Sequence, residues 1–404
     1  MRQLLALRDA RLYLAGQFLS ILGDNALWLA MAIWVKTLTG SSSAAGLVFM
    51  AFALPQLLGP LFGVLVDRLP RRPLLIAANL ALAPVVLTLA AVRGPSDVWL
   101  IYAVMAVYGA AYALLDAGQS ALLQAALPDE VLPNMNGALQ ALRQGLRLVS
   151  PLVGAGLFVL VGGSAVAAVD AATFVAAAAA LALMRVPEIR QRPPAVPWWD
   201  EVTAGIRHVA RTTLLRQLTV AGVLAVLVLG FSESVIFAVV DRGLHQPPAF
   251  LGVLAAMQGA GGLAGGLLAA TAVRWAREAR ACALGIALMA AGDLLLVVPN
   301  LVAAIVGFAI FGAGLPVAIV AVITLIQRST PAELQGRAYA AVALLISAPQ
   351  ALSIGLGAAL LVVVDYRVLL LAMAAVMGGA AIYAVTRPQP TGAPAVRADV
   401  EHAT

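Results

Sequence analysis

Three acids interrupt long apolar runs of this sequence, and each is a candidate for proton transfer. Asp24, Asp116 and Glu233 lie inside stretches that are otherwise almost entirely hydrophobic. A charge at the centre of a membrane-spanning helix costs about 2.5–3.5 kcal/mol on insertion scales, so such a residue faces a partner or a water-filled cavity. We therefore predict proton-coupling roles for these acids. The competing interpretation is a structural one: a hydrogen-bond anchor for Asp24, a latch beside Arg68 or Arg71 for Asp116.

Polar and aromatic residues accompany these acids at helical spacing. Gln17, Ser20, Asp24 and Trp28 recur at intervals of three and four, which places them on one helix face. A polar stripe that ends in an indole suits a cargo that is partly apolar and partly hydrogen-bonding. The predicted cargo-binding residues are Gln17, Asn25, Trp28, Tyr108, Tyr112, Arg147, Phe237 and Gln350.

Other charged residues in the apolar runs receive different predictions. Arg143 is expected at the inner membrane edge, while Arg147 lies more than a turn deeper and is expected to point into a cavity. A buried arginine beside a buried aspartate forms either a proton-controlled switch or a permanent ion pair. Asp170 and Asp293 lie nearer the outer edge of their runs, so hydration at the rim is expected for both.

Enzymatic and metal chemistry are not expected. A single cysteine, Cys282, excludes an internal disulfide and most metal sites, and the three histidines show no ligand spacing. The sequence contains no nucleophile–base pair or phosphate loop of credible spacing. We predict no catalytic residues, no metal and no cofactor.

The elements that position these residues follow from composition. Of 404 residues, 62% are hydrophobic and 11% charged, whereas a soluble domain carries about 25% charged residues. About 20 apolar residues span a bilayer as a helix, and no strand-like alternation is evident. We predict an all-α integral membrane protein with spans at 12–35, 44–66, 73–92, 98–123, 139–161, 165–185, 218–240, 249–272, 281–298, 301–326, 338–363 and 367–386.

The distribution of basic residues predicts the orientation of these spans. With twelve helices, nineteen arginines lie in the termini and loops of one side, against Lys36, Arg93, Arg242 and Arg367 on the other. Cytoplasmic loops carry the excess of basic residues. Both termini are therefore predicted in the cytoplasm, and the basic composition needs no nucleic acid to explain it.

A longer polar segment divides the chain into two halves. We predict a six-helix bundle at 1–186, a cytoplasmic linker at 187–216, a second bundle at 217–387 and a disordered cytoplasmic tail at 388–404. Apolar residues from Trp198 onward recur at helical spacing, with acids first and arginines last, which indicates an amphipathic helix on the inner membrane surface. An ordinary soluble linker is the alternative.

Similarity between the halves supports a duplication. Gly109, Gln124, Pro128 and Glu130 match Gly312, Gln327, Pro331 and Glu333, and all four pairs share an offset of 203 residues. Equivalent positions at about half the chain length predict two pseudo-symmetric six-helix bundles.

One charged turn resembles a known family motif. "GVLVDRLPRR" is similar to the loop between the second and third helices of the major facilitator superfamily, with Gly63, Asp67, Arg68, Arg71 and Arg72 at the matching positions and Pro70 where glycine is usual. "QRSTPAELQGR" and "SILGDNAL" resemble its twelve-helix drug:proton antiporters, which include macrolide and siderophore exporters. "SPLVGAG" matches that branch's helix 5 signature only in part, because Ser150 and Ala155 replace glycines.

The resemblance implies a function and a role for the charged turn. In this family the turn is a gate latch, with Asp67 near the start of helix 11 and its arginines paired with neighbouring loops; topology enforcement is the alternative for the arginines. The expected protein is a monomeric secondary transporter of the bacterial inner membrane, which exports amphipathic antibiotic-like or siderophore-like molecules in exchange for protons. Its partners are then cargo, protons and membrane lipid, with no nucleic acid. Import, lipid flipping, or a non-transporting receptor or assembly role are the alternatives.

Overall fold

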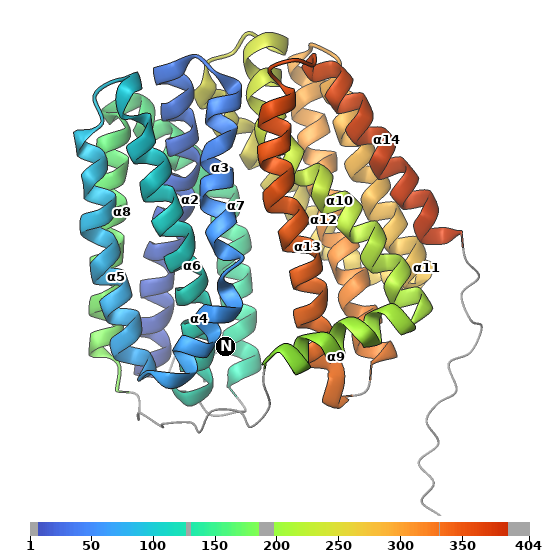
Figure 1. The fold of residues 1–404 in the computed structure, drawn as a ribbon, viewed down its shortest axis with the longest axis horizontal. Coiled ribbons are helices and arrows are strands. Elements are labelled where there is room, and N and C mark those ends of the chain that lie inside the picture. Colours follow the sequence, from blue (N-terminus) through green and yellow to red (C-terminus); the bar gives the residue numbers. More distant parts are fainter. Residues whose placement is uncertain (1–6, 127–130, 186–197, 331, 387–404) are drawn as a thin grey trace, which may run out of the picture.

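A computed structural model describes residues 7–126, 131–185, 198–330 and 332–386, and every regular element in these ranges is helical. The first half contains α2 (Arg8–Thr39), α3 (Ser42–Gln56), α4 (Gly59–Arg68), α5 (Arg71–Leu87), α6 (Val98–Ala126), α7 (Leu132–Val161) and α8 (Gly163–Leu183). The second contains α9 (Trp198–Arg211), α10 (Thr213–Ala238), α11 (Leu251–Leu296), α12 (Leu301–Ser329), α13 (Ala332–Leu360) and α14 (Tyr366–Val385). Figure 1 shows the two halves as neighbouring helix bundles.

The predicted spans correspond to these helices. Within the described ranges, eight helices are long and apolar enough to cross a membrane. One of them, 248–296, contains the span predicted at 249–272 and all but the last two residues of the span predicted at 281–298. The three spans that remain coincide with the shorter apolar helices at 42–56, 145–161 and 344–360. The all-helical, two-bundle fold class is confirmed.

Two helix boundaries differ from prediction for backbone reasons. The span predicted at 44–66 is divided into α3 and α4, because Pro60 cannot continue a helix from Gln56 but fits the first turn of a new one. The loop expected before residue 281 is only a sharp turn inside α11, where Arg277 adopts φ 63° and ψ 168°.

The duplication is visible in how the helices cross. A Cβ added at Gly109 of α6 would collide with the carbonyl oxygen of Phe52 on α3. A Cβ added at the repeat partner Gly312 of α12 would collide in the same way with the carbonyl oxygen of Gln258 on α11. Each half therefore uses its matching glycine to bring the equivalent pair of helix backbones into contact.

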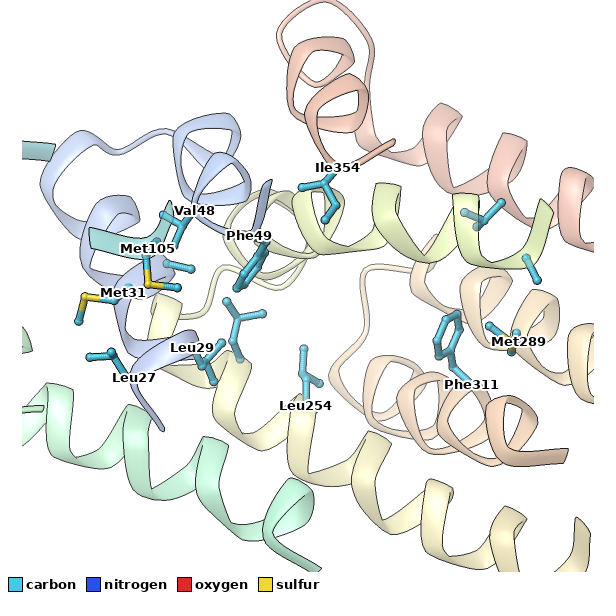
Figure 2. Packing of buried hydrophobic residues seen from close by; sticks show 14 of the residues in the cluster. Leu27, Leu29, Met31, Val48, Phe49, Met105, Leu254, Met289, Phe311 and Ile354 are labelled. Atoms are coloured by element: carbon cyan, nitrogen blue, oxygen red, sulfur yellow. The ribbon is translucent and has the colours of Figure 1, made fainter. Parts of the chain in front are cut away.

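The core extends through both halves, and Figure 2 shows part of it. The halves contact each other where α3 meets α13 and where α7 meets α11. The Ser43 hydroxyl donates to the carbonyl of Ala358, and a Cβ at Gly259 would lie 2.9 Å from the Cα of Leu148. Small residues thus permit close approach across the boundary between the bundles.

The predicted amphipathic linker helix is present as α9. It packs against α13 and α10 across one end of the second half (Figure 1), with Val209 buried. His208 Nε2 lies 3.1 Å from Thr330 Oγ1, which ties α9 to the end of α12. Placement of α9 at a lipid surface stays a prediction. Residues 186–197 and the tail from 387 lie outside the described residues.

Candidate functional site

A polar cavity of about 290 Å³ lies among α2, α6 and α7 of the first half. Six residues predicted from the sequence line it together: Gln17, Asp24, Asn25, Tyr112, Asp116 and Arg147. They meet because the helical spacing of α2 directs one stripe of side chains toward the stripes of α6 and α7. Ser20, Gln119 and Arg143 complete its polar lining.

Asp24 is held in this cavity by two hydroxyl groups. The Tyr108 hydroxyl donates to Asp24 Oδ1 at 2.5 Å, and the Ser20 hydroxyl donates to Oδ2 at 3.4 Å. The Tyr108 ring is buried between the rings of Phe52 and Phe174. The buried Tyr108 hydroxyl fixes the orientation of the Asp24 carboxylate. Because this carboxylate also borders the cavity, it stays accessible from that side.

The cavity also contains an ion pair between α6 and α7. Arg143 Nη2 lies 3.3 Å from Asp116 Oδ1, and both side chains are about half exposed. Arg143 also borders the cavity, and it pairs with an acid two turns along α6 from Tyr108. Its position at the inner membrane edge stays a prediction. Pairs this exposed contribute about 0–1 kcal/mol, so this one is easily broken.

A second cavity, of about 100 Å³, lies between the halves and is lined by aliphatic side chains and five aromatic rings; we call it the aromatic cavity. Trp28 of α2 stacks on Phe49 of α3 with ring centroids 4.2 Å apart, and Phe49 lies 6.0 Å from Phe237 of α10. Glu233 borders the same cavity.

The aspartates expected at a hydrated rim are deeply buried instead. Asp170 and Asp293 are each 1% exposed, and Oδ2 of each has no hydrogen-bond partner among the described residues. Asp170 packs beside Gly23 and Thr173, where α8 crosses α2. Asp293 borders the aromatic cavity. The prediction of hydration at the rim is wrong, because the position of a residue along its own helix does not show whether a neighbouring helix buries its side chain.

The structure describes only part of the charged turn. The surroundings of Gly63 and the side chains of Asp67 and Arg68 are not described, so the gating role of these residues stays a prediction. Arg71 begins α5. Arg72 donates from Nε to the carbonyl of Leu181 at 2.9 Å and from Nη2 to that of Ala182, which caps the end of α8 within the first half. Gln350, on α13, borders neither cavity.

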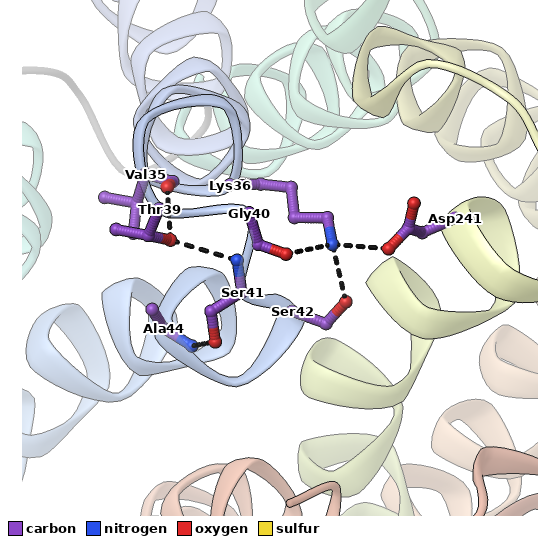
Figure 3. Close-up of polar contacts among 8 residues, drawn as sticks. All are labelled: Val35, Lys36, Thr39, Gly40, Ser41, Ser42, Ala44 and Asp241. Carbon is purple, nitrogen blue, oxygen red and sulfur yellow. Dashed lines mark hydrogen bonds and ion pairs between the residues drawn. The ribbon is translucent and has the colours of Figure 1, made fainter. Parts of the chain in front are cut away.

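One contact between the halves was not predicted from the sequence. The ammonium group of Lys36, at the end of α2, lies 2.6 Å from Asp241 Oδ2 and donates to Gly40 O at 2.7 Å and Ser42 Oγ at 3.1 Å (Figure 3). Asp241 belongs to a π-turn (Val239–Gly243) that follows α10. The two residues lie at the ends of α2 and α10 and are 205 positions apart, so no pattern along one helix could have revealed the pair.

Comparisons with known proteins agree with this architecture. The sequence model of the Major Facilitator Superfamily matches residues 13–353. Macrolide efflux protein A of Streptococcus pyogenes is 30% identical over 181 residues, and its counterpart from Enterococcus faecalis is 29% identical over 155. These alignments cover 44% and 38% of this chain, and 45% and 48% of those proteins, so the chain matches about half their length.

Solved structures extend the comparison to the whole fold. The nucleoside transporter NupG superposes with a TM-score of 0.74 at 10% identity, covering 93% of this chain and 98% of that one. A bacterial homologue of the iron transporter ferroportin, in an inward-facing state, gives 0.72 at 14% identity, covering 94% and 98%. At these identities the likeness concerns the fold alone.

Proposed function

The chain belongs to the Major Facilitator Superfamily and is a multi-pass membrane transporter, and from that premise we propose that it exports amphipathic small molecules in exchange for protons. The two bundles rock around a central site so that it opens to one side at a time. We place the protein in a bacterial cytoplasmic membrane with both termini inside.

The observation that carries the proposal is the environment of Asp24. This carboxyl group lies in a membrane-spanning helix, borders the polar cavity and is oriented by Tyr108 and Ser20. A membrane-buried acid with access to a cavity is a natural place to bind and release a proton. Glu233 and Asp116 border cavities as well and are the other candidate proton carriers.

The contacts between the halves support alternating access. The Lys36–Asp241 pair and the Ser43–Ala358 hydrogen bond lie where α2 turns into α3, at the end of the molecule opposite to α9 in Figure 1. These contacts hold the halves together at that end. With both termini in the cytoplasm, this is the external end, and the bundles must separate there to release cargo outward.

The cavities and the sequence relatives favour an organic cargo. Polar groups line one cavity, and mainly apolar side chains, five of them aromatic, line the other; Trp28 on α2 follows Asp24 by one helical turn. This combination suits a molecule with polar and apolar parts. The named relatives are macrolide efflux proteins, which supports export of antibiotic-like compounds over import or lipid flipping on the same scaffold.

A growth assay tests the proposal and separates it from a non-transporting receptor. Cells that lack their own exporters would express the wild type, Asp24→Asn or Asp97→Asn, and be challenged with macrolides and siderophore analogues. Asp97 is a partly exposed acid that borders neither cavity. We expect wild type and Asp97→Asn to raise tolerance several-fold and Asp24→Asn to abolish it at equal membrane abundance. Equal tolerance conferred by wild type and Asp24→Asn would contradict proton coupling through Asp24.

A further inference from the structure

The turn between the two limbs of α11, at residues 274–280, carries a surplus of positive charge; we call it the arginine turn. Its arginines are all exposed, and none of them belongs to an ion pair of the described residues: Arg274, Arg277 and Arg280. Glu278, the only acid of the turn, pairs instead with Arg328 of α12 at 2.5 Å. Among the described residues, the three arginines therefore have no counter-ion.

The backbone at the centre of the turn indicates that an arginine side chain has a use there. Arg277 adopts φ 63° and ψ 168°, a backbone conformation that is essentially restricted to glycine. Glycine would make this turn without strain, yet position 277 carries a long cationic side chain. Strain of this kind points to a function, because the backbone alone favours a different residue.

Both limbs of α11 lead from exposed apolar surfaces to the arginine turn. On the first limb, Leu267 is 84% exposed, and Trp275 lies two helical turns further on the same face and is 87% exposed. On the second limb, Leu284 is 48% exposed one turn after Arg280. α11 belongs to a segment that is long and apolar enough to cross a membrane, so these leucines face acyl chains. Tryptophan is enriched at the membrane–water interface, which places the adjacent Arg274 at the level of the lipid headgroups.

We propose that the arginine turn binds the phosphate of an anionic phospholipid, whose acyl chains lie along the exposed leucines of α11. Guanidinium groups match phosphate geometry through paired N–H donors. Unneutralised arginines at a membrane surface favour a headgroup with a net negative charge over a zwitterionic one. The turn belongs to the arginine-rich side that we place in the cytoplasm, where the membrane surface is negative. This lipid site depends neither on the cargo nor on the proton carrier of the proposed function.

Native mass spectrometry of the full chain in detergent measures lipid binding directly. The protein would be titrated with phosphatidylglycerol and, separately, with phosphatidylcholine that has the same acyl chains. Because the two lipids share their apolar part and differ in net charge, any preference reports on the headgroup. We expect the wild type to bind phosphatidylglycerol at least about fivefold more tightly.

Matched double variants locate the site. Arg274→Gln with Arg280→Gln should weaken phosphatidylglycerol binding about twenty-fivefold, from about fivefold for each arginine near an anionic surface, and leave phosphatidylcholine binding unchanged. Arg93→Gln with Arg242→Gln is the control, because it removes the same charge from two exposed arginines outside the turn, and it should keep the wild-type preference. Replacing Arg274 and Arg280 with lysine retains the charge and should also keep a preference for phosphatidylglycerol. Thermal unfolding of each variant verifies that it is folded.

The outcomes separate the lipid site from other occupants and from the proposed function. Equal binding of both lipids by the wild type would overturn the lipid site, and so would an equal loss of phosphatidylglycerol in the glutamine variant of the turn and in the control. Displacement of the lipid by excess inorganic phosphate would assign the turn to a free anion, and a second copy of the chain bound in place of lipid would assign it to a dimer contact; either result would overturn the lipid site. Selective binding of phosphatidylglycerol that depends on Arg274 and Arg280 supports the site even if the growth assay shows no export.

Discussion

Replacing Lys36 with methionine should separate the two halves at the end where α2 turns into α3. Methionine keeps most of the length of the side chain but removes the ammonium group that bonds Asp241, Ser42 and the carbonyl of Gly40. Among the ion pairs of the described residues, the variant loses the one that joins the two bundles. We expect its conformational equilibrium to shift toward a state that is open at this end.

The size of the shift follows from the exposure of the two partners. The Lys36 side chain is 6% exposed and that of Asp241 is 49% exposed. The pair therefore falls between exposed pairs, worth about 0.2–1 kcal/mol, and buried pairs, whose disruption costs about 3–5 kcal/mol. A value of about 1.5 kcal/mol corresponds to roughly a tenfold change in the ratio of closed to open molecules.

Distance measurements between spin labels can detect this change. Ser96→Cys and Val363→Cys place labels on exposed residues at the same end of the first and second halves. Cys282 is fully buried, so it is not expected to react. Lys36→Met should increase the population at long distance, and Asp241→Asn should act in the same direction. An identical distance distribution in wild type and Lys36→Met would refute the role of this pair in closing the halves.

Two further predictions follow from the packing and from the polar cavity. Gly109→Ala should lower the free energy of unfolding of the purified protein by about 1–3 kcal/mol, because the added methyl group collides with the α3 backbone. Gly156→Ala is the control and should leave the stability unchanged, because Gly156 has open space around it. Equal stability of both variants would contradict the close crossing of α6 and α3. Tyr108→Phe should reduce proton-driven export about tenfold through loss of the 2.5 Å hydrogen bond to Asp24, whereas full activity in everted vesicles would show that Asp24 needs no such positioning.

Local patterns predicted the elements of this fold and much of the polar cavity. Helical spacing was enough to place Gln17, Asp24 and Arg147 at one cavity, because side-chain direction repeats with the helix. The repeat offset identified Gly109 and Gly312, whose equivalent helix crossings the structure confirms.

Features that depend on neighbouring helices were not predictable in the same way. Neighbouring helices pack against Asp170 and Asp293 and determine their burial. The Lys36–Asp241 pair joins residues that are 205 positions apart in the sequence. The turn at Arg277 has no proline or glycine at the turning residue to indicate it. Each of these features needs the arrangement of the bundles, which periodicity along one helix does not contain.

The most direct test of the account is the dependence of transport on a proton gradient through Asp24. Everted membrane vesicles with an acidic interior would be supplied with a radiolabelled macrolide, and accumulation would be measured before and after an ionophore collapses the gradient. The account predicts accumulation by the wild type that stops with the ionophore, and none by Asp24→Asn. Accumulation that survives collapse of the gradient, or that is equal in Asp24→Asn, would contradict it.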